Sequence, residues 1–157
     1  MEDLINGLVE KYSDMVLQIA YQHTFNKSDS EDITQEVFIK LVKNLEDLKS
    51  EDYIKAWLIR VTINLCKDYN KSYWNKKTSE LDENIGSEDE FSDVMEYVSK
   101  LKSKYRDIIY LYYYQGYKIN EIAKILSMNE NTVSSSLTRA RKELKEILTD
   151  GGEVYGF

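Results

Sequence analysis

No proline occurs in the 157 residues, and apolar residues recur at three- and four-residue steps along most of the chain. Because an α-helix turns once in about 3.6 residues, this spacing gathers apolar side chains on one face of successive helices. No stretch of useful length alternates apolar and polar residues as a strand does. The sequence therefore predicts an all-α fold.

Three helical stretches are expected before residue 77. The first is an apolar stripe over residues 5–19, and the second a stripe over residues 33–45. Ser28 and Glu31 have the spacing of a capping box, which predicts where the second helix begins. The third helix is expected over residues 56–74 and is apolar on more than one side, as a central bundle helix should be.

The helical spacing stops at an acidic segment and resumes after it. Residues 78–99 hold eight acidic residues and no basic one, and helical spacing starts again at Phe91. A tyrosine-rich helix follows and is expected to end at Gly116. The sequence predicts two small helical domains: residues 1–76, an acidic linker at 77–90, a second domain at 91–149 and a flexible tail at 150–157.

The end of the second domain has the pattern of a helix-turn-helix. A short helix marked by Ile119, Ile122, Ala123 and Leu126 precedes a turn and a longer helix, for which Asn129 is the expected N-cap. If the apolar stripe of the longer helix faces the core, five polar residues face outward: Asn131, Ser135, Thr138, Arg139 and Lys142. The alternative is a solvated helical hairpin in an ordinary bundle.

A second basic segment lies in the third helix. Residues 55–77 hold six basic residues and one acidic residue, and residues 131–145 hold four and one. Tyr69, Tyr73 and Trp74 lie among these bases, and aromatic rings beside cations can stack unpaired nucleotide bases. The alternative is that Trp57 and Tyr69 belong to the core and the lysines to a solvated edge. The tyrosine run over residues 110–117 has helix-packing spacing and is assigned mostly to the core.

The overall charge is −7, so the two basic segments imply two separate contacts with a polyanion rather than a general basic coat. Enzyme classes find little support, because there is no glycine-rich phosphate loop and no nucleophile elbow. Asp32 and Glu36 lie one helical turn apart, but nothing nearby completes a catalytic or metal site. Cys66 and His23 are the only residues of their types, which argues against a disulfide and a zinc site.

We therefore expect no catalytic residue, metal, cofactor or small-molecule substrate. The chain has no apolar run long enough to span a bilayer, and its first residues do not have the pattern of a signal peptide. These features predict a cytoplasmic protein.

Three blocks of the sequence, taken in order, resemble bacterial sigma factors of the extracytoplasmic-function (ECF) group, which belong to the sigma-70 family. "SEDITQEVFIKLVKNL" resembles the helix that docks on the polymerase clamp, and "AWLIRVTINLCKDYNK" the helix that melts and reads the minus-ten element. The block from "LKSKYRDIIY" to "TRARKEL" resembles the fourth sigma domain, which binds the minus-thirty-five element and the polymerase flap. The resemblance extends over roughly Leu8 to Leu148.

The resemblance implies a role for particular residues. Contacts with polymerase are implied for Asp32, Gln35, Glu36, Phe38 and Lys40. Minus-ten contacts are implied for Lys55, Trp57, Arg60, Asn64, Lys67, Asp68 and Lys71, and residues 46–55 are implied to form a loop that holds a flipped-out base. Minus-thirty-five contacts are implied for Asn129, Asn131, Thr132, Ser134, Ser135, Ser136, Thr138, Arg139 and Lys142.

The resemblance implies three partners: core RNA polymerase, promoter DNA and an anti-sigma factor. Members of the family commonly carry a basic residue at the positions of Ser134 and Ser136, so this chain departs from the pattern there. Two other readings stay open from the sequence. One is a sigma-like activator that binds DNA without core polymerase, and the other is a purely structural helical protein.

Overall fold

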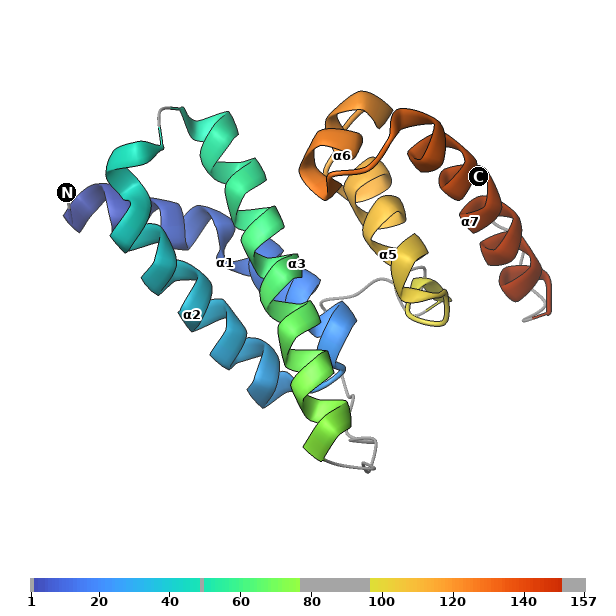
Figure 1. Cartoon of the computed structure of the whole chain (residues 1–157), viewed down its shortest axis with the longest axis horizontal. Coiled ribbons are helices and arrows are strands. Elements are labelled where there is room, and N and C mark those ends of the chain that lie inside the picture. The colour runs from blue at the N-terminus through green and yellow to red at the C-terminus, as the bar shows by residue number, and fades with distance from the viewer. Residues whose placement is uncertain (1, 49, 77–96, 151–157) are drawn as a thin grey trace. The chain divides into compact units, whose positions relative to one another are not determined.

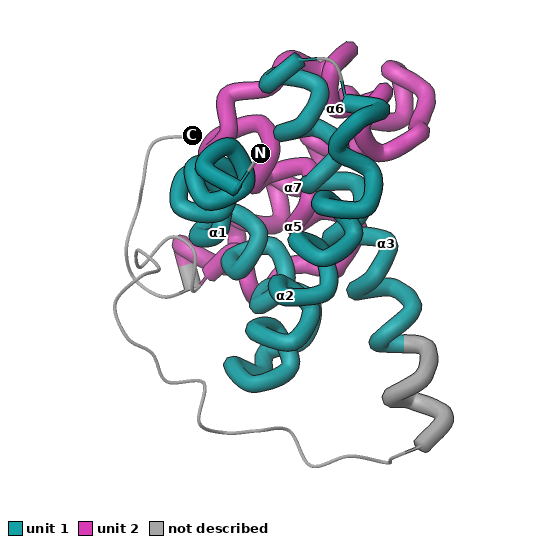
Figure 2. Tube along the Cα trace, turned by 90° about the vertical axis from the view of Figure 1, so that its left-hand side faces the viewer, with its two compact units in different colours: residues 1–86 teal, residues 87–157 magenta. Residues whose placement is uncertain are grey.

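A computed structural model describes residues 2–48, 50–76 and 97–150 of the chain. It divides into two units, residues 1–86 and 87–157, which are coloured separately in Figure 2. Helices account for the regular structure of the described residues, and no strand occurs among them. The prediction of an all-α, two-part chain is confirmed. The acidic linker and Phe91, at which the helical spacing resumes, lie outside the described residues.

Three long helices form the first unit: α1 (Glu2–Thr24), α2 (Lys27–Asn44) and α3 (Glu51–Lys76) (Figure 1). Each of them packs against the other two. Their shared core contains fully buried side chains from all three helices, among them Val16, Leu41 and Leu58. The only cysteine, Cys66, is also completely buried in α3. The core therefore fixes which face of each helix remains in contact with solvent.

The start of α2 differs from the sequence prediction. Helix α2 begins at Lys27, and the side chain of Asn26 accepts a hydrogen bond of 2.9 Å from the backbone N–H of Asp29. The predicted capping box of Ser28 and Glu31 is therefore wrong, because both residues already lie inside the helix. Phe25 has φ +51 and makes the sharp corner between α1 and α2.

The short connection between α2 and α3 is more regular than predicted. A 3-10 turn, η1 (Leu45–Asp47), follows α2, and α3 begins at Glu51 rather than at Ala56. Ile54 is buried, so the core stripe of α3 extends into its first turn. The predicted loop over residues 46–55 is thus reduced to residues 48–50, of which residue 49 lies outside the described part.

The second unit contains α5 (Ser103–Ile109), η2 (Tyr110–Tyr114), α6 (Ile119–Leu126) and α7 (Glu130–Asp150). Helix α7 packs against both α5 and α6. Buried Ile108, Ile122, Val133 and Leu144 represent all three helices in this core. The turn of the helix-turn-helix therefore stands between two helices that share an apolar interface.

The tyrosine run continues α5 as a π-helical turn, η2. Gly116 follows with φ +72, which agrees with the predicted helix end. Tyr110 is buried, but Tyr113 and Tyr114 are exposed to 39% and 42%. The assignment of the run mostly to the core is thus wrong for these two rings. The wider π turn was not predicted, because it has no spacing signature in the sequence.

Candidate polymerase and nucleic-acid surfaces

Helix α2 turns a mixed polar and apolar face to solvent. Ile33, Val37 and Leu41 are buried, whereas the predicted contact residues Asp32, Gln35, Glu36 and Lys40 are exposed. Phe38 is only 9% exposed, so it supports the helix from the core side and does not present its ring to a partner. The polymerase contact that the resemblance implies for Phe38 therefore does not agree with the burial of its ring.

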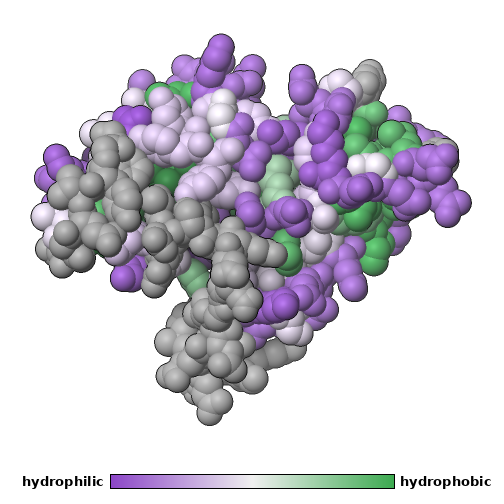
Figure 3. All heavy atoms as spheres, turned by 180° about the vertical axis from the view of Figure 1, so that it is seen from behind, coloured by the Kyte–Doolittle hydropathy of each residue, from purple (hydrophilic) through white to green (hydrophobic). Residues whose placement is uncertain are grey.

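Two apolar residues on this exposed face were missed. Ile39 and Val42 are 54% and 49% exposed and lie one turn apart on α2. Figure 3, which views the molecule from behind, shows that hydrophobic side chains also reach the surface elsewhere, among hydrophilic ones. The signal in the sequence was that these two residues fall off the core stripe formed by Ile33, Val37 and Leu41. An apolar centre with a charged border is typical of protein–protein contact surfaces.

Helix α3 presents most of the predicted minus-ten residues along one side. Asn64, Lys67 and Asp68 are exposed, and Lys55, Trp57 and Arg60 are half-buried. Steps of three and four residues from Trp57 to Lys67 keep those side chains within one face of the helix, whereas Lys55, nine residues before Asn64, lies on the opposite side. The side chains of Lys71, Tyr73 and Trp74 lie outside what the structure describes. This face thus carries two basic residues, one acidic residue and an indole ring, and it is not strongly positive.

The C-terminal half of α3 is tied to α2. The Tyr69 hydroxyl donates a hydrogen bond to the Asp29 carboxylate, and Tyr69 is half-buried. Tyr69 therefore braces the two helices. The alternative weighed from the sequence, that Tyr69 is structural, agrees with this contact.

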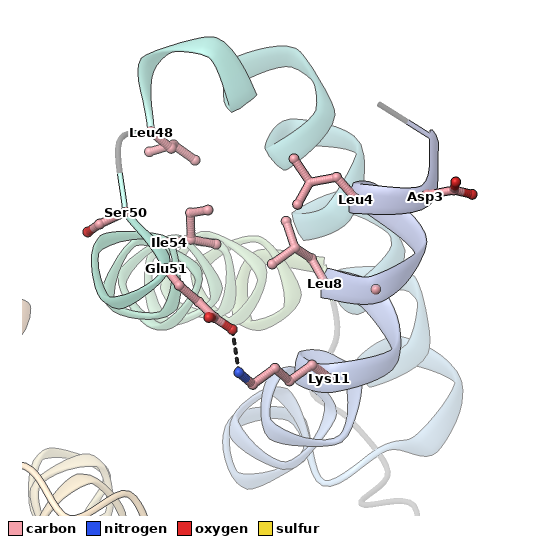
Figure 4. A pocket seen from close by; sticks show the side chains of 9 residues that line it. Asp3, Leu4, Leu8, Lys11, Leu48, Ser50, Glu51 and Ile54 are labelled. Carbon is pink, nitrogen blue, oxygen red and sulfur yellow. Dashed lines mark hydrogen bonds and ion pairs between the residues drawn. The ribbon is translucent and has the colours of Figure 1, made fainter.

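A cavity of about 450 Å³ lies beside the connection between η1 and α3 (Figure 4). Its walls combine aliphatic and polar side chains from α1, from Leu48 and Ser50, and from the first turn of α3. The lining residues are Asp3, Leu4, Gly7, Leu8, Lys11, Leu48, Ser50, Glu51 and Ile54.

One side of the cavity is closed by an ion pair between Lys11 and Glu51. Both side chains are more than half exposed, so solvent screens their attraction. The Tyr12 hydroxyl donates a second hydrogen bond to Oε1 of Glu51, with 3.1 Å between the oxygens. Glu51 therefore connects α1 to the point at which α3 begins.

The turn between α6 and α7 has the geometry of a helix-turn-helix. Ser127 ends α6 in the left-handed conformation, at φ +56 and ψ +48, and Met128 N donates to Ala123 O across 2.8 Å. Asn129 Oδ1 accepts a hydrogen bond of 2.8 Å from the backbone N–H of Asn131. This capping bond confirms Asn129 as the N-cap of α7.

The outward face of α7 contains most of the predicted minus-thirty-five residues. Exposed side chains are those of Asn129, Asn131, Thr132, Ser134, Ser135, Thr138, Arg139 and Lys142. Ser136, for which the resemblance implies a minus-thirty-five contact, is only 8% exposed and so does not belong to this outward face. It lies next to the buried residue Leu137 and turns toward the core. The remaining surface is polar but has few full charges at its N-terminal end.

No cluster of three or more His, Cys, Asp or Glu side chains that could hold a metal ion occurs among residues 2–48, 50–76 and 97–150. Within the same ranges, no helix is both long enough and apolar enough to cross a membrane.

Both units match known families. Residues 8–76 match the family model of sigma-70 region 2, and residues 91–144 match that of sigma-70 region 4. The first match begins within α1 and extends to the end of α3, and the second covers α5 and α6 and ends within α7. The chain belongs to the sigma-70 family, and is therefore a transcription initiation factor rather than an enzyme.

The relatives specify the group within that family. The chain is 29% identical to the RNA polymerase sigma factor SigV of Bacillus subtilis over 140 residues, which cover 84% of this chain and 83% of SigV. It is 26% identical to the ECF RNA polymerase sigma factor SigW of the same species, covering 95% of this chain and 91% of SigW. Its group is accordingly the ECF sigma factors, as the sequence resemblance indicated.

Solved structures share the fold. The sigma factor RpoE of Bartonella quintana superposes with a TM-score of 0.72 at 19% identity, covering 95% of this chain and 98% of RpoE. CnrH superposes with a TM-score of 0.71 at 22% identity, covering 96% and 90%. The two other readings from the sequence, a polymerase-independent activator and a structural helical protein, receive no support from these matches.

Proposed function

We propose that core RNA polymerase docks on the exposed face of α2. Ile39 and Val42 form its apolar centre, and Glu36 and Lys40 belong to its charged border. Burial of the two aliphatic side chains supplies affinity, while the charges select the orientation of the partner. The polymerase clamp is the partner that the family resemblance indicates for this helix, and the flap is the one for the second unit.

We further propose that α3 and α7 read the two promoter elements. The face of α3 that carries Arg60, Asn64 and Lys67 contacts melted DNA at the minus-ten element. The basic side chains of Arg60 and Lys67 bind phosphates of the DNA backbone there. The face of α7 that carries Asn131, Ser135 and Arg139 enters the major groove at the minus-thirty-five element.

Residues 48–50 and the first turn of α3 are our proposed site for a flipped-out base. The neighbouring cavity offers aliphatic walls from Leu4, Leu8 and Ile54 and polar groups from Ser50 and Glu51. Pockets that accept a flipped base combine apolar stacking surfaces with hydrogen-bonding groups of this kind. The ion pair between Lys11 of α1 and Glu51, the first residue of α3, joins these two walls of the cavity.

The observation that carries the proposal is that each unit has one helix, α3 or α7, whose exposed face is polar and only weakly charged. A net charge of −7 disfavours approach to phosphates by the free chain. A polymerase that binds both units holds them in register, so that each bound element raises the effective concentration of the other. Weak reading surfaces are then sufficient for promoter selection.

An anti-sigma factor is the proposed regulatory partner. RpoE of Bartonella quintana, which shares the fold, was solved in complex with the anti-sigma factor NepR. Such a partner would block polymerase by covering the exposed apolar residues of α2, because these residues form the proposed docking surface for polymerase. Because the proposed partner polymerase works in the cytoplasm, we place the protein there as well.

Run-off transcription tests the proposal. The chain and core polymerase are combined on a fragment that spans the promoter region of its own gene, since many ECF genes are self-promoted. We expect a discrete transcript only when both proteins are present. A mobility-shift assay on the same fragment should show a specific complex only with polymerase. Specific binding by the chain alone, without a transcript, would support a polymerase-independent activator instead.

A further inference from the structure

The basic residues of α7 do not share one environment. Arg139 and Lys142 are exposed, whereas Arg141 is half-buried. At about 100° per residue, position 141 lies roughly 120° around the helix from position 135. Arg141 therefore stands to the side of the face that we assign to DNA, next to the core stripe of Leu137 and Ala140.

Arg141 contacts the tyrosine turn η2. Its Nε donates a hydrogen bond to the Tyr113 hydroxyl, with 2.5 Å between the two atoms. Its guanidinium carbon lies 5.3 Å from the Tyr112 ring centroid and 5.6 Å from that of Tyr113. The two rings meet edge to face, 5.0 Å apart. One guanidinium thus binds two rings through cation–π contacts and one hydroxyl through a hydrogen bond.

The π-helical geometry of η2 contributes to this arrangement. Gln115 N donates to Tyr110 O across 3.2 Å, which is the five-residue step of a π turn. The wider turn changes the direction of the side chains that follow, relative to an unbroken α-helix. Single π turns within helices occur frequently at functional sites. Here the turn precedes Gly116, and it places Tyr112 and Tyr113 against α7.

We propose that Tyr112 and Tyr113, acting through Arg141, are positioning residues that fix the rotation of α7 about its own axis and so determine how sharply the minus-thirty-five element is discriminated. This inference rests on the proposed function of α7. Hydrogen bonds to base edges need correct distance and angle, whereas attraction to phosphates tolerates small rotations. A looser α7 therefore loses sequence preference before it loses general affinity.

The link is insensitive to pH over the range used for binding measurements. The hydrogen bond to Tyr113 raises the pKa of the Arg141 guanidinium further above its ordinary range. Arg141 therefore stays charged, and the link is broken by substitution rather than by titration.

The test uses holoenzyme assembled from the full chain and core polymerase. A promoter is first selected by wild-type holoenzyme from a library with a randomised minus-thirty-five element. Binding to this promoter and to single-base variants is then measured at several salt concentrations, for Tyr113→Phe and Arg141→Met. Tyr114→Phe is the matched control, because it removes a hydroxyl from the neighbouring exposed ring and keeps the stacking of that ring on Tyr110, at 5.6 Å.

We expect Tyr113→Phe to reduce the preference for the selected element by about three- to tenfold, as loss of one hydrogen bond would. Arg141→Met should reduce it further, and neither change should alter the log–log salt slope. Tyr114→Phe should match wild type. If Arg141→Met prevents the second unit from folding, as seen by circular dichroism, the milder Tyr113→Phe decides the question.

Two results would overturn the inference. If Arg141→Met lowers the salt slope by about one while Tyr113→Phe has no effect, Arg141 is a phosphate contact. If both variants keep full discrimination, the tyrosine turn does not position α7. Wild-type holoenzyme that shows no minus-thirty-five preference at all would instead refute the proposed function of α7 itself.

Discussion

The Tyr12 hydroxyl donates a hydrogen bond to Oε1 of Glu51 across 3.1 Å, and it thereby joins the middle of α1 to the first turn of α3. Lys11 binds the same carboxylate. The residues before Glu51 form the short connection that we assign to base capture. A contact at this point therefore limits how far the connection can move away from α1.

Stability of the first unit should depend on Glu51 in acid. The hydrogen bond from Lys11, and then that from Tyr12, lowers the pKa of Glu51 below its ordinary value of 4.5. A carboxyl group with a depressed folded-state pKa stabilises the fold above its unfolded pKa, and this contribution disappears as pH falls through the folded pKa. Thermal unfolding of wild type and Glu51→Gln is compared from pH 7 down to about pH 2.5.

We expect wild type to have the higher Tm at neutral pH and the difference to vanish at the acid end. Asp52→Asn, which removes a neighbouring exposed carboxylate from the same helix turn, is the control and should show a smaller difference. A gap between wild type and Glu51→Gln that stays constant over the whole range would contradict the assignment.

Gln22 is a stability defect that a single substitution should repair. It is 3% exposed, and its Oε1 and Nε2 have no hydrogen-bond partner among the described residues. A buried amide without partners costs about 1–3 kcal/mol. Gln22→Met keeps the side-chain length and should raise the free energy of unfolding of the first unit by about 1 kcal/mol. Chemical denaturation measures this, with the half-buried Gln18→Met as a control that should bring no gain. A loss of stability in Gln22→Met would mean that the amide is satisfied after all.

Reversal of charge on α2 should weaken polymerase binding without unfolding the helix. Glu36 is exposed beside the apolar patch of Ile39 and Val42. We expect Glu36→Lys to reduce affinity for core polymerase about tenfold, which is about 1.4 kcal/mol. Glu10→Lys makes the same charge change on α1 and should bind normally. Equal affinity of the two variants in a titration with labelled chain would move the docking surface away from α2.

The serines of α7 should separate general affinity from sequence preference. Ser134 and Ser135 are exposed, but neither carries the charge that releases a counterion from DNA. Ser134→Lys should strengthen holoenzyme binding to all promoters and steepen the log–log salt slope by about one unit. Ser135→Ala should change the ranking of minus-thirty-five variants more than the mean affinity. A flat salt slope for the first variant, or a uniform shift for the second, would show that this face does not meet DNA.

Helix positions were predictable because apolar spacing reports burial. The stripes of α1, α2, α6 and α7 agree with their buried residues, and Asn129 was recognised as a cap from its position before α7. Local competition between caps was harder to predict. Asn26 and Ser28 are both good cap residues, and the choice depends on where Phe25 makes the corner, which is a tertiary effect.

The individual site residues were less predictable than the helices. Phe38 and Ser136 lie at the edges of core stripes, where a small rotation of the helix decides between exposure and burial. The role of Arg141 depends on rings 28 and 29 residues away in the chain and on a π turn without a sequence pattern. Spacing within one helix contains no information on such a contact.

Cys66 is a natural probe of local opening in the first unit. The chain has one thiol, and the fold covers it completely. A soluble thiol reagent can reach it only during transient opening, so the labelling rate under native conditions measures the opening equilibrium. No engineered probe is needed, and the second unit contributes no signal because it has no cysteine. Binding of a partner to α2 or α3 should then slow the labelling of the Cys66 thiol, and this can be measured on the natural chain without any substitution.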